Sequence, residues 1–216
     1  MRTPLHTLYV VRHGENPANL NREFSYKLID YSLTEKGVRQ AEETASFFRE
    51  KGIDAIYSSP LKRARETAQI IAAPLALPVA IVEEFRENNV GDLERDPPNE
   101  AAWALHDGII ADWFAGRHDA LFPGGEDFHT LLRRVRTGLI ATLADLGGEP
   151  GAKRAVIVAH GGILGGMARG LAHEPDLAAV EARKCANCSV SEFGARLIDG
   201  ELEFHLREWS SCDHLS

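Results

Sequence analysis

The sequence predicts a three-layer α/β/α fold, with a mostly parallel central sheet, an antiparallel edge and a helical cap insertion. First, short β-branched runs alternate with segments whose apolar residues recur at helical spacing. Second, Asp199-Gly200 separates two strand-like runs, which is a strong hairpin signal. Third, residues 88–128 interrupt the alternation. The 216 residues show no internal repeat and suffice to bury one core, so we expect a single domain.

The predicted elements follow one another as strand and then helix along most of the chain. We expect strands at 8–11, 55–58, 78–82 and 155–159, and helices at 35–51, 62–73, 128–146 and 162–171. In 128–146 the apolar residues form one buried stripe: Phe128, Leu131, Leu132, Val135, Leu139 and Leu143. The runs at 189–198 and 201–209 predict the antiparallel edge.

The segment 88–128 has a different composition from the rest of the chain. It carries Pro97-Pro98, Gly124-Gly125 and a group of large aromatic residues, which are Trp103, Trp113, Phe114 and Phe122. We interpret it as an irregular helical insertion that forms a cap at about 92–127. Such insertions at the carboxyl ends of parallel strands commonly cover a ligand crevice. Most of its aromatic residues are expected to pack the insertion onto the core.

Charge and cysteine content exclude several classes of protein. With 24 Lys and Arg against 32 Asp and Glu, the net charge of −8 argues against a surface that coats nucleic acid, but not against a local phosphate pocket. No secretory signal precedes Val11, and no apolar run approaches the roughly 20 residues that span a bilayer. Three cysteines are too few for a disulfide framework. We therefore expect a cytoplasmic protein that does not insert into membranes.

Two strand-like runs end in the same dipeptide, His-Gly, at His13 and at His160. The carboxyl ends of parallel strands meet at one edge of a sheet, where helix N-termini present unpaired N–H groups to an anion. We therefore expect the two imidazoles to lie together. Arg12 and Arg63 would add two permanent cations, and guanidinium groups match phosphate oxygens in geometry. The pattern indicates a phosphate site.

Six motifs occur in the order found in the histidine phosphatase superfamily, in its phosphoglycerate mutase-like branch. They are Arg12-His13-Gly14-Glu15 with Asn19; Leu33-Thr34-Glu35-Lys36-Gly37 with Gln40-Ala41; Ser58-Ser59-Pro60-Leu61 through Arg63-Ala64 with Thr67-Ala68; Phe85-Arg86-Glu87 with Gly91; Gly124-Gly125-Glu126; and His160-Gly161-Gly162. The resemblance thins between residues 91 and 123 and after 187. The sequence thus resembles a single histidine phosphatase domain over residues 1–216.

The resemblance implies a nucleophile, His13, that forms a phosphohistidine intermediate, and a proton donor, Glu87. The catalytic residues that it implies are His13, Glu87, His160, Arg12 and Arg63. The substrate-binding residues that it implies are Arg12, Asn19, Arg63 and Gly161. It implies no metal and no cofactor. Residue chemistry agrees, because histidine can form covalent intermediates and fixed cations stabilise a transferring phosphoryl group.

We expect hydrolysis of a small phosphomonoester. The first alternative is a cofactor-dependent phosphoglycerate mutase. Such an enzyme usually binds the carboxylate of its substrate with several additional cations. Residues 88–132 contain nine acidic residues, and their only Lys or Arg residues are Arg95 and Arg117. Such a cover disfavours a second phosphate and suits a neutral, cationic or partly apolar leaving group. The second alternative is a catalytically inactive phosphate-binding relative. It would be expected to lack one of the catalytic residues, and none is missing.

Several charged residues lie outside the motifs or depart from the family pattern. Lys27 either neutralises an acidic group of the substrate or is solvated, and Arg95 replaces a glycine that the family pattern expects. Glu94 is expected to be a solvated loop acid, like Glu83 and Glu84. The substrate is expected to be a small phosphorylated metabolite, with no nucleic-acid or membrane partner, and homodimer formation stays open.

The pair Cys185 and Cys188 superficially resembles the Cys-x-x-Cys element of zinc deaminases, with His13 and Glu15 as a His-x-Glu element. Lys184 stands where those enzymes require proline, and a zinc site would leave the arginines unused. We therefore expect both cysteines to be small, mostly buried residues near a turn.

Overall fold

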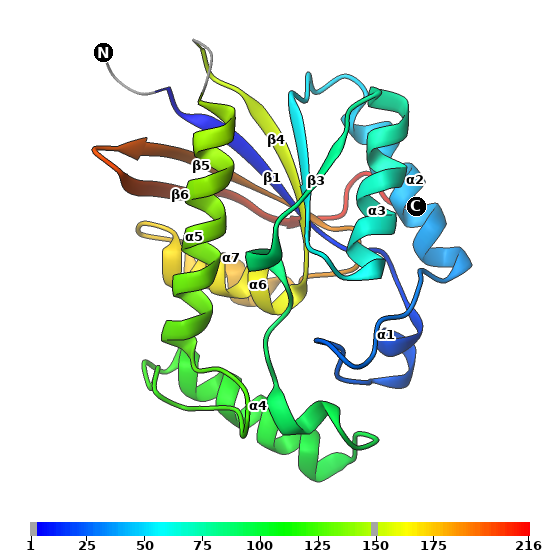
Figure 1. Ribbon diagram of the computed structural model, residues 1–216, viewed down its shortest axis with the longest axis vertical. Coiled ribbons are helices and arrows are strands. Elements are labelled where there is room, and N and C mark those ends of the chain that lie inside the picture. The colour runs from blue at the N-terminus through cyan, green and yellow to red at the C-terminus, as the bar shows by residue number, and fades with distance from the viewer. Residues whose placement is uncertain (1–3, 148–150) are drawn as a thin grey trace.

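A computed structural model describes residues 4–147 and 151–216, and its elements follow the predicted order (Figure 1). The strands are β1 (His6–Arg12), β2 (Ala55–Ser58), β3 (Val79–Ile81), β4 (Arg154–Ala159), β5 (Val190–Ile198) and β6 (Glu201–Ser211). The helices are α1 (Pro17–Asn21), α2 (Glu35–Phe48), α3 (Lys62–Ala72), α4 (Glu100–Phe114), α5 (Phe128–Leu146), α6 (Gly161–Gly166) and α7 (Leu177–Ala182). Short 3₁₀ turns lie at Ala73–Leu75, Glu83–Phe85 and Gly91–Glu94, and a π-helical turn lies at Met167–Leu171.

The sheet confirms the predicted mixture of parallel and antiparallel pairing. Its strand order is β3-β2-β4-β1-β5-β6. The first four of these strands pair in parallel, and β1–β5 and β5–β6 pair antiparallel. At the β5–β6 turn, Asp199 and Gly200 both have positive φ (52° and 85°), as the expected hairpin turn requires. Arg12 lies opposite Ala159 in the β1–β4 register, so the chain leaves both strands at neighbouring points.

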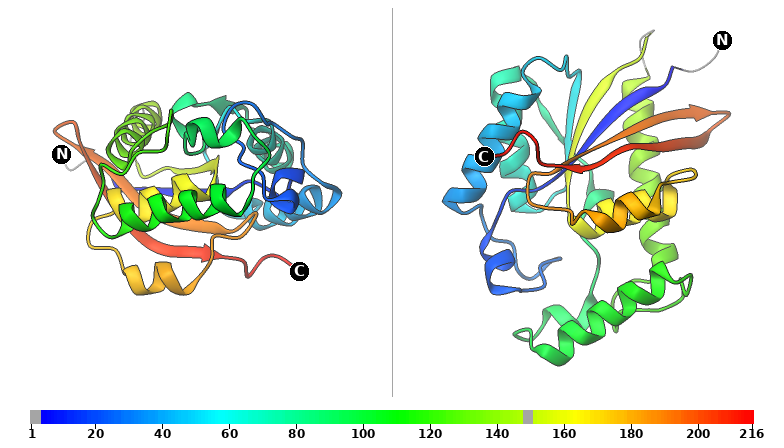
Figure 2. Two further views of the ribbon diagram at one scale, coloured as in Figure 1. Left: turned by 90° about the horizontal axis from the view of Figure 1, so that it is seen from below. Right: turned by 180° about the vertical axis from the view of Figure 1, so that it is seen from behind.

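Helices cover both faces of the sheet, which gives the predicted three layers (Figure 2). Side chains of β1 alternate between the faces. Val11 packs with Phe48 of α2 and with α3, whereas Val10 packs in a second cluster with Leu139 of α5 and with α6. The α5 stripe is buried as predicted, except that Leu132 is only partly buried.

The insertion forms one regular helix, α4, which is capped at its N-terminus by the side chain of Asn99. Figure 1 shows α4 standing away from the sheet, beyond the ends of β1 and β4. Trp113 and Phe122 are buried in the main core cluster, whereas Phe114 is exposed. The expectation that most of the aromatic residues pack on the core is therefore confirmed for Trp113 and Phe122, and Trp103 is partly buried against the same cluster. It is wrong for Phe114.

The short helices α1 and α7 and one break in a predicted helix were not predicted. Helix α1 has only five residues and is held by a capping box between Asn16 and Asn19, so it has no apolar period to detect. The segment predicted as one helix at 162–171 is α6 followed by the π-helical turn. Its glycines allow close packing, since a Cβ on Gly170 would lie 2.6 Å from Leu132. Among the described residues, no helix has the length and apolarity needed to cross a membrane.

Candidate active site

The two His-Gly segments meet at the edge of the sheet, as the sequence predicts. His13 directly follows β1 and His160 directly follows β4. Their ring centroids lie 5.2 Å apart, and the two residues are 2% and 0% exposed. The backbone N–H of His13 donates to the carbonyl of Ala159 at 3.0 Å, which continues the β1–β4 pairing up to the imidazoles.

The contacts of His13 define which of its ring nitrogens carries the proton. Arg63 Nε lies 3.1 Å from His13 Nε2. A guanidinium group has only donors, so Nε2 must offer its lone pair. His13 Nδ1 then carries the hydrogen and donates it to the carbonyl of Gly14 at 2.8 Å. The result is a neutral imidazole that presents a lone pair on Nε2.

Gly14 allows the loop after β1 to pass close to helix α2. A Cβ on Gly14 would lie 2.6 Å from the carbonyl oxygen of Gly37. The N–H of Gly14 donates to Thr67 Oγ1 of α3 at 3.0 Å. Residues of two different motifs thereby fix the carbonyl that orients His13.

Arg63 lies in the first turn of α3 and is 3% exposed. Its Nη1 donates to Ser25 Oγ and its Nη2 to the carbonyl of Ser25, both at 2.7 Å. Burial lowers the pKa of Arg63 to about 10, against the opposing charges of Glu87 and Asp30. The group therefore stays cationic at neutral pH.

Arg12 and His160 each have a side-chain nitrogen that is hydrogen-bonded to the protein and a second buried nitrogen that is not, in the part of the chain that the structure describes. Arg12 Nη1 donates to the carbonyl of Cys185 at 2.6 Å, and His160 Nε2 lies 2.7 Å from Ser59 Oγ. Within the described residues, Arg12 Nε and His160 Nδ1 are buried and make no hydrogen bond. Two nitrogen atoms close to His13 are therefore free of protein partners.

Asn19 is held so that its amide nitrogen is spare. Its Oδ1 accepts from the backbone N–H of Asn16 at 3.2 Å and from Asn187 Nδ2 at 3.0 Å. Asn187 Nδ2 also donates to the carbonyl of His13 at 2.9 Å. Because the oxygen of Asn19 has two donors, its Nδ2 is the atom left for a ligand.

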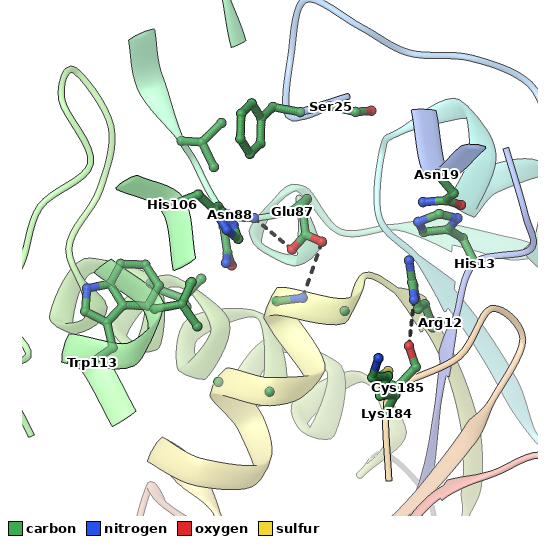
Figure 3. A pocket seen from close by; sticks show the side chains of 18 of the residues that line it. Arg12, His13, Asn19, Ser25, Glu87, Asn88, His106, Trp113, Lys184 and Cys185 are labelled. Atoms are coloured by element: carbon green, nitrogen blue, oxygen red, sulfur yellow. Dashed lines mark hydrogen bonds between the residues drawn. The ribbon is translucent and has the colours of Figure 1, made fainter. Parts of the chain in front are cut away.

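Glu87 projects into the same space from the segment after β3 (Figure 3). Its Oε1 accepts from the N–H of Asn88 at 2.9 Å and its Oε2 from the N–H of Gly162 at 3.3 Å. Arg134 of α5 donates to the carbonyls of Arg86 and Glu87 at 2.6 and 2.9 Å. The backbone that carries the Glu87 carboxylate is thus fixed by the partly buried guanidinium of Arg134.

These side chains line one cavity of about 530 Å³. Of the predicted site residues, those that line it are Arg12, His13, Asn19, Arg63, Glu87 and Gly161, while His160 is buried beside His13. Helix α4 supplies an apolar wall, formed by Trp103, Ile110, Trp113 and Phe114. Arg169, Arg183 and Lys184 line another part, so the cavity has basic residues that do not come from the insertion.

The family profile of the histidine phosphatase superfamily (branch 1) matches residues 8–206 of the chain. The chain belongs to the histidine phosphatase superfamily. It is 35% identical over 211 residues to phosphoglycerate mutase-like protein 4 of Arabidopsis thaliana, covering 96% of this chain and 86% of the relative. It is 31% identical to the uncharacterised phosphatase PhoE of Bacillus subtilis, with 96% and 95% covered.

A solved mycobacterial structure has the same fold as this member of the superfamily. It is a glucosyl-3-phosphoglycerate phosphatase in complex with VO3, with a TM-score of 0.75 and 25% identity over 95% of this chain and 99% of that one. The predicted fold class and family are therefore confirmed. The relatives include both phosphatases and a mutase-like protein, so they do not decide the reaction.

Several residues that build this histidine phosphatase site were missed in the sequence. Ser25 and Asn187 contact the predicted residues from loops without any motif of their own. Ser59 lies within a quoted motif, but the sequence did not predict its contact with His160. The interpretation of Glu94 as a solvated acid is wrong, because it is 7% exposed and accepts several backbone hydrogen bonds. A lone acid in a loop carries no sequence signal for such burial.

Lys27 and Arg95 are exposed and do not line the cavity, which favours the solvated interpretation of Lys27. Cys188 is fully buried and Cys185 partly buried, as expected of small packing residues. Among the described residues, no group of three or more His, Cys, Asp or Glu side chains is placed to hold a metal ion.

Because of His13 and His160, we expect the free energy of unfolding to fall in acid. Burial and the charge of Arg63 hold the pKa values of His13 and His160 well below 6.5. Below that pH the unfolded chain binds protons that the folded chain does not, so stability falls as pH falls. Each histidine adds about 1.4 kcal/mol per pH unit to this dependence while the folded imidazole stays neutral.

Urea unfolding between about pH 5 and pH 7 tests this, with His160→Gln as the variant. The variant should show a shallower dependence of the unfolding free energy on pH than the parent. Parallel pH dependences in the two proteins would contradict the neutral state of His160.

Proposed function

We propose that the protein is a metal-independent phosphatase that hydrolyses a small phosphomonoester through a phosphohistidine intermediate on His13. The observation that carries this proposal is the contact between Arg63 Nε and His13 Nε2. It shows that the lone pair of the neutral imidazole is on Nε2, where it accepts a hydrogen bond from Arg63. A phosphoryl group that Nε2 attacks would displace this hydrogen bond, and the Arg63 guanidinium would then donate to the phosphoryl oxygens. Histidine is a known covalent nucleophile in its neutral form.

In this proposal the phosphate lies between Arg12, Arg63 and His160. The spare donors described above, Arg12 Nε and His160 Nδ1, would bind its oxygens when Nδ1 carries the imidazole proton, with Asn19 Nδ2 and the Gly161 N–H beside them. A phosphoryl group in transfer spreads its charge over three equatorial oxygens. Fixed donors and cations around those oxygens stabilise the transition state more than the free ester.

Glu87 would act first as acid and then as base. The lone pair of His13 Nε2 attacks phosphorus, the ester P–O bond breaks, and Glu87 gives its proton to the departing oxygen. Water then attacks phosphohistidine, the P–N bond breaks and its electron pair returns to Nε2, while Glu87 takes a proton from the water. Two-step transfer allows one carboxyl group to serve both steps.

Helix α4 supports an apolar leaving group, which was one of the options that the composition left open. Trp103 and Trp113 each donate their single N–H to a protein carbonyl, of Arg22 and Ala120 respectively. These indoles therefore offer apolar ring surface to the cavity and no donor. We propose that residues 92–127 act as a cap that contacts the leaving group.

A mutase remains the second candidate, since Arg169, Arg183 and Lys184 line the cavity. Arg169 lies 3.3 Å from a carboxylate oxygen of Glu181 and 4.2 Å from the Phe114 ring centroid, so its charge is already partnered. Arg183 and Lys184 are the cations that favour an acidic substrate such as phosphoglycerate.

Release of inorganic phosphate from n-alkyl phosphates of increasing length, in the presence of a metal chelator, tests the proposal. The leaving groups are equally basic, so only apolar contact changes. Each methylene buried against α4 should raise kcat/KM by about fourfold. The variant Ile110→Gln should remove this gain, and Leu105→Gln, an exposed position on the same helix, should keep it.

Conversion of 3-phosphoglycerate to 2-phosphoglycerate is measured alongside. Faster isomerisation than hydrolysis would overturn the phosphatase proposal in favour of the mutase. Hydrolysis without any dependence on chain length would overturn only the apolar leaving-group contact.

A further inference from the structure

Glu94 is a buried carboxylate that organises one loop beside the active site. The backbone N–H groups of four consecutive residues converge on its Oε1: Tyr26, Lys27 and Leu28 at 2.8 Å, and Ile29 at 3.1 Å. The N–H of Lys27 also donates to Oε2 at 2.9 Å. One side chain therefore satisfies the donors of the whole turn.

The shape of this turn depends on a negative charge at its centre. A buried carboxylate is costly unless it is fully hydrogen-bonded, and bonds to an ionised acceptor are roughly twice as strong as neutral ones. Four N–H groups that point at one atom would repel each other without it. The turn and the Glu94 carboxylate are therefore formed together.

The same loop holds Arg63. Ser25, the residue before the turn, accepts hydrogen bonds from both terminal nitrogens of the Arg63 guanidinium, one at its hydroxyl oxygen and one at its carbonyl oxygen, each at 2.7 Å. The Ser25 hydroxyl donates in turn to the carbonyl of Ile29 at 2.8 Å, which closes the loop on itself. Arg63 then contacts His13 through Nε. A continuous path of hydrogen bonds leads from Glu94 to the imidazole.

We propose that Glu94 is a positioning residue for phosphoryl transfer: it fixes the 25–29 loop, and through Ser25 it sets the orientation of the Arg63 guanidinium toward His13. This inference rests on the proposed function of His13 and Arg63. Glu94 itself does not line the cavity, so it acts without touching the substrate.

The variant Glu94→Gln keeps the size of the side chain but removes the charge and turns an NH2 group toward backbone N–H donors. We expect kcat/KM to fall roughly tenfold to a hundredfold, the range seen when a supporting residue lets a catalytic group shift. Glu94→Asp, which keeps the charge, should recover part of the loss. Asp92→Asn is the matched control, since this exposed acid lies in the same 3₁₀ turn.

A double-mutant cycle with Arg63→Ala separates positioning from general stabilisation. If Glu94 acts through Arg63, Glu94→Gln should change kcat/KM less than about threefold once Arg63 is absent. Equal fold-losses in both backgrounds would overturn the proposal. If Glu94→Gln does not yield folded protein, the cycle is run with Glu94→Asp and judged by the same criterion.

The same cycle on the affinity for inorganic phosphate, measured by calorimetry, requires no turnover. Weaker phosphate binding in Glu94→Gln that disappears in the Arg63→Ala background would support Glu94 even if the parent fails to hydrolyse esters. Additive losses in affinity would overturn it even if hydrolysis proceeds as proposed.

Discussion

His13→Ala is expected to abolish hydrolysis, with kcat/KM lower by roughly 10⁴-fold or more, because the variant has no nucleophile to accept the phosphoryl group. The parent incubated with a ³²P-labelled ester and quenched in alkali should carry label that is released by acid, as expected of a phosphoramidate. The alanine variant should carry none. Since its cavity keeps Arg12 and Arg63, it should still bind inorganic phosphate.

His106→Asn is the matched control for this experiment, because His106 also lines the cavity but comes from α4. It should keep the acid-labile label. Label and turnover that persist in His13→Ala would exclude His13 as the nucleophile, whatever the family resemblance implies.

Glu87→Gln should reduce activity in a way that depends on the leaving group. An alkoxide needs a proton as it departs, so kcat/KM for an n-alkyl phosphate should fall roughly 10²- to 10⁴-fold. A nitrophenolate leaves without one, so kcat/KM for p-nitrophenyl phosphate should fall far less. The phosphoenzyme formed from that ester should accumulate, because its hydrolysis lacks the base, and a burst of nitrophenol would report it.

Glu83→Gln is the control, since Glu83 lies four residues earlier and its side chain is exposed. The role of Glu87 is rejected if the alkyl and nitrophenyl esters lose the same factor, or if turnover of the alkyl ester is unchanged.

Much of the fold could be predicted because its signals are local. The stripe in 128–146, the Asp199-Gly200 turn and the strand runs each report on residues near them, and the structure confirms α5, the β5–β6 hairpin and the parallel strands. The meeting of His13 and His160 was predictable for a different reason. Parallel strands end at a common edge, so two identical strand endings are expected at the same edge of the sheet. That β1 and β4 are direct neighbours there is shown by the structure.

The supporting residues could not be predicted because their partners are distant and mostly backbone. Glu94 binds N–H groups that lie more than sixty positions away, and Arg134 binds the carbonyls of Arg86 and Glu87. Backbone groups are the same at every residue, so such contacts leave no trace in residue types. From the sequence alone, Arg134 of α5 is also interpreted as an ordinary solvated residue on the polar face of a helix, because its contacts are known only from the structure.

The order of strands in the sheet has a consequence for how the protein folds. The first strand, β1, lies between β4 and β5, which both belong to the last third of the chain. During synthesis β1 therefore has neither neighbour until residues beyond 153 have been made, and its unpaired edges stay exposed. Contacts of such long sequence separation form slowly. His13 and His160 are thus brought together late, and a chain that stops before β4 cannot assemble a phosphate site.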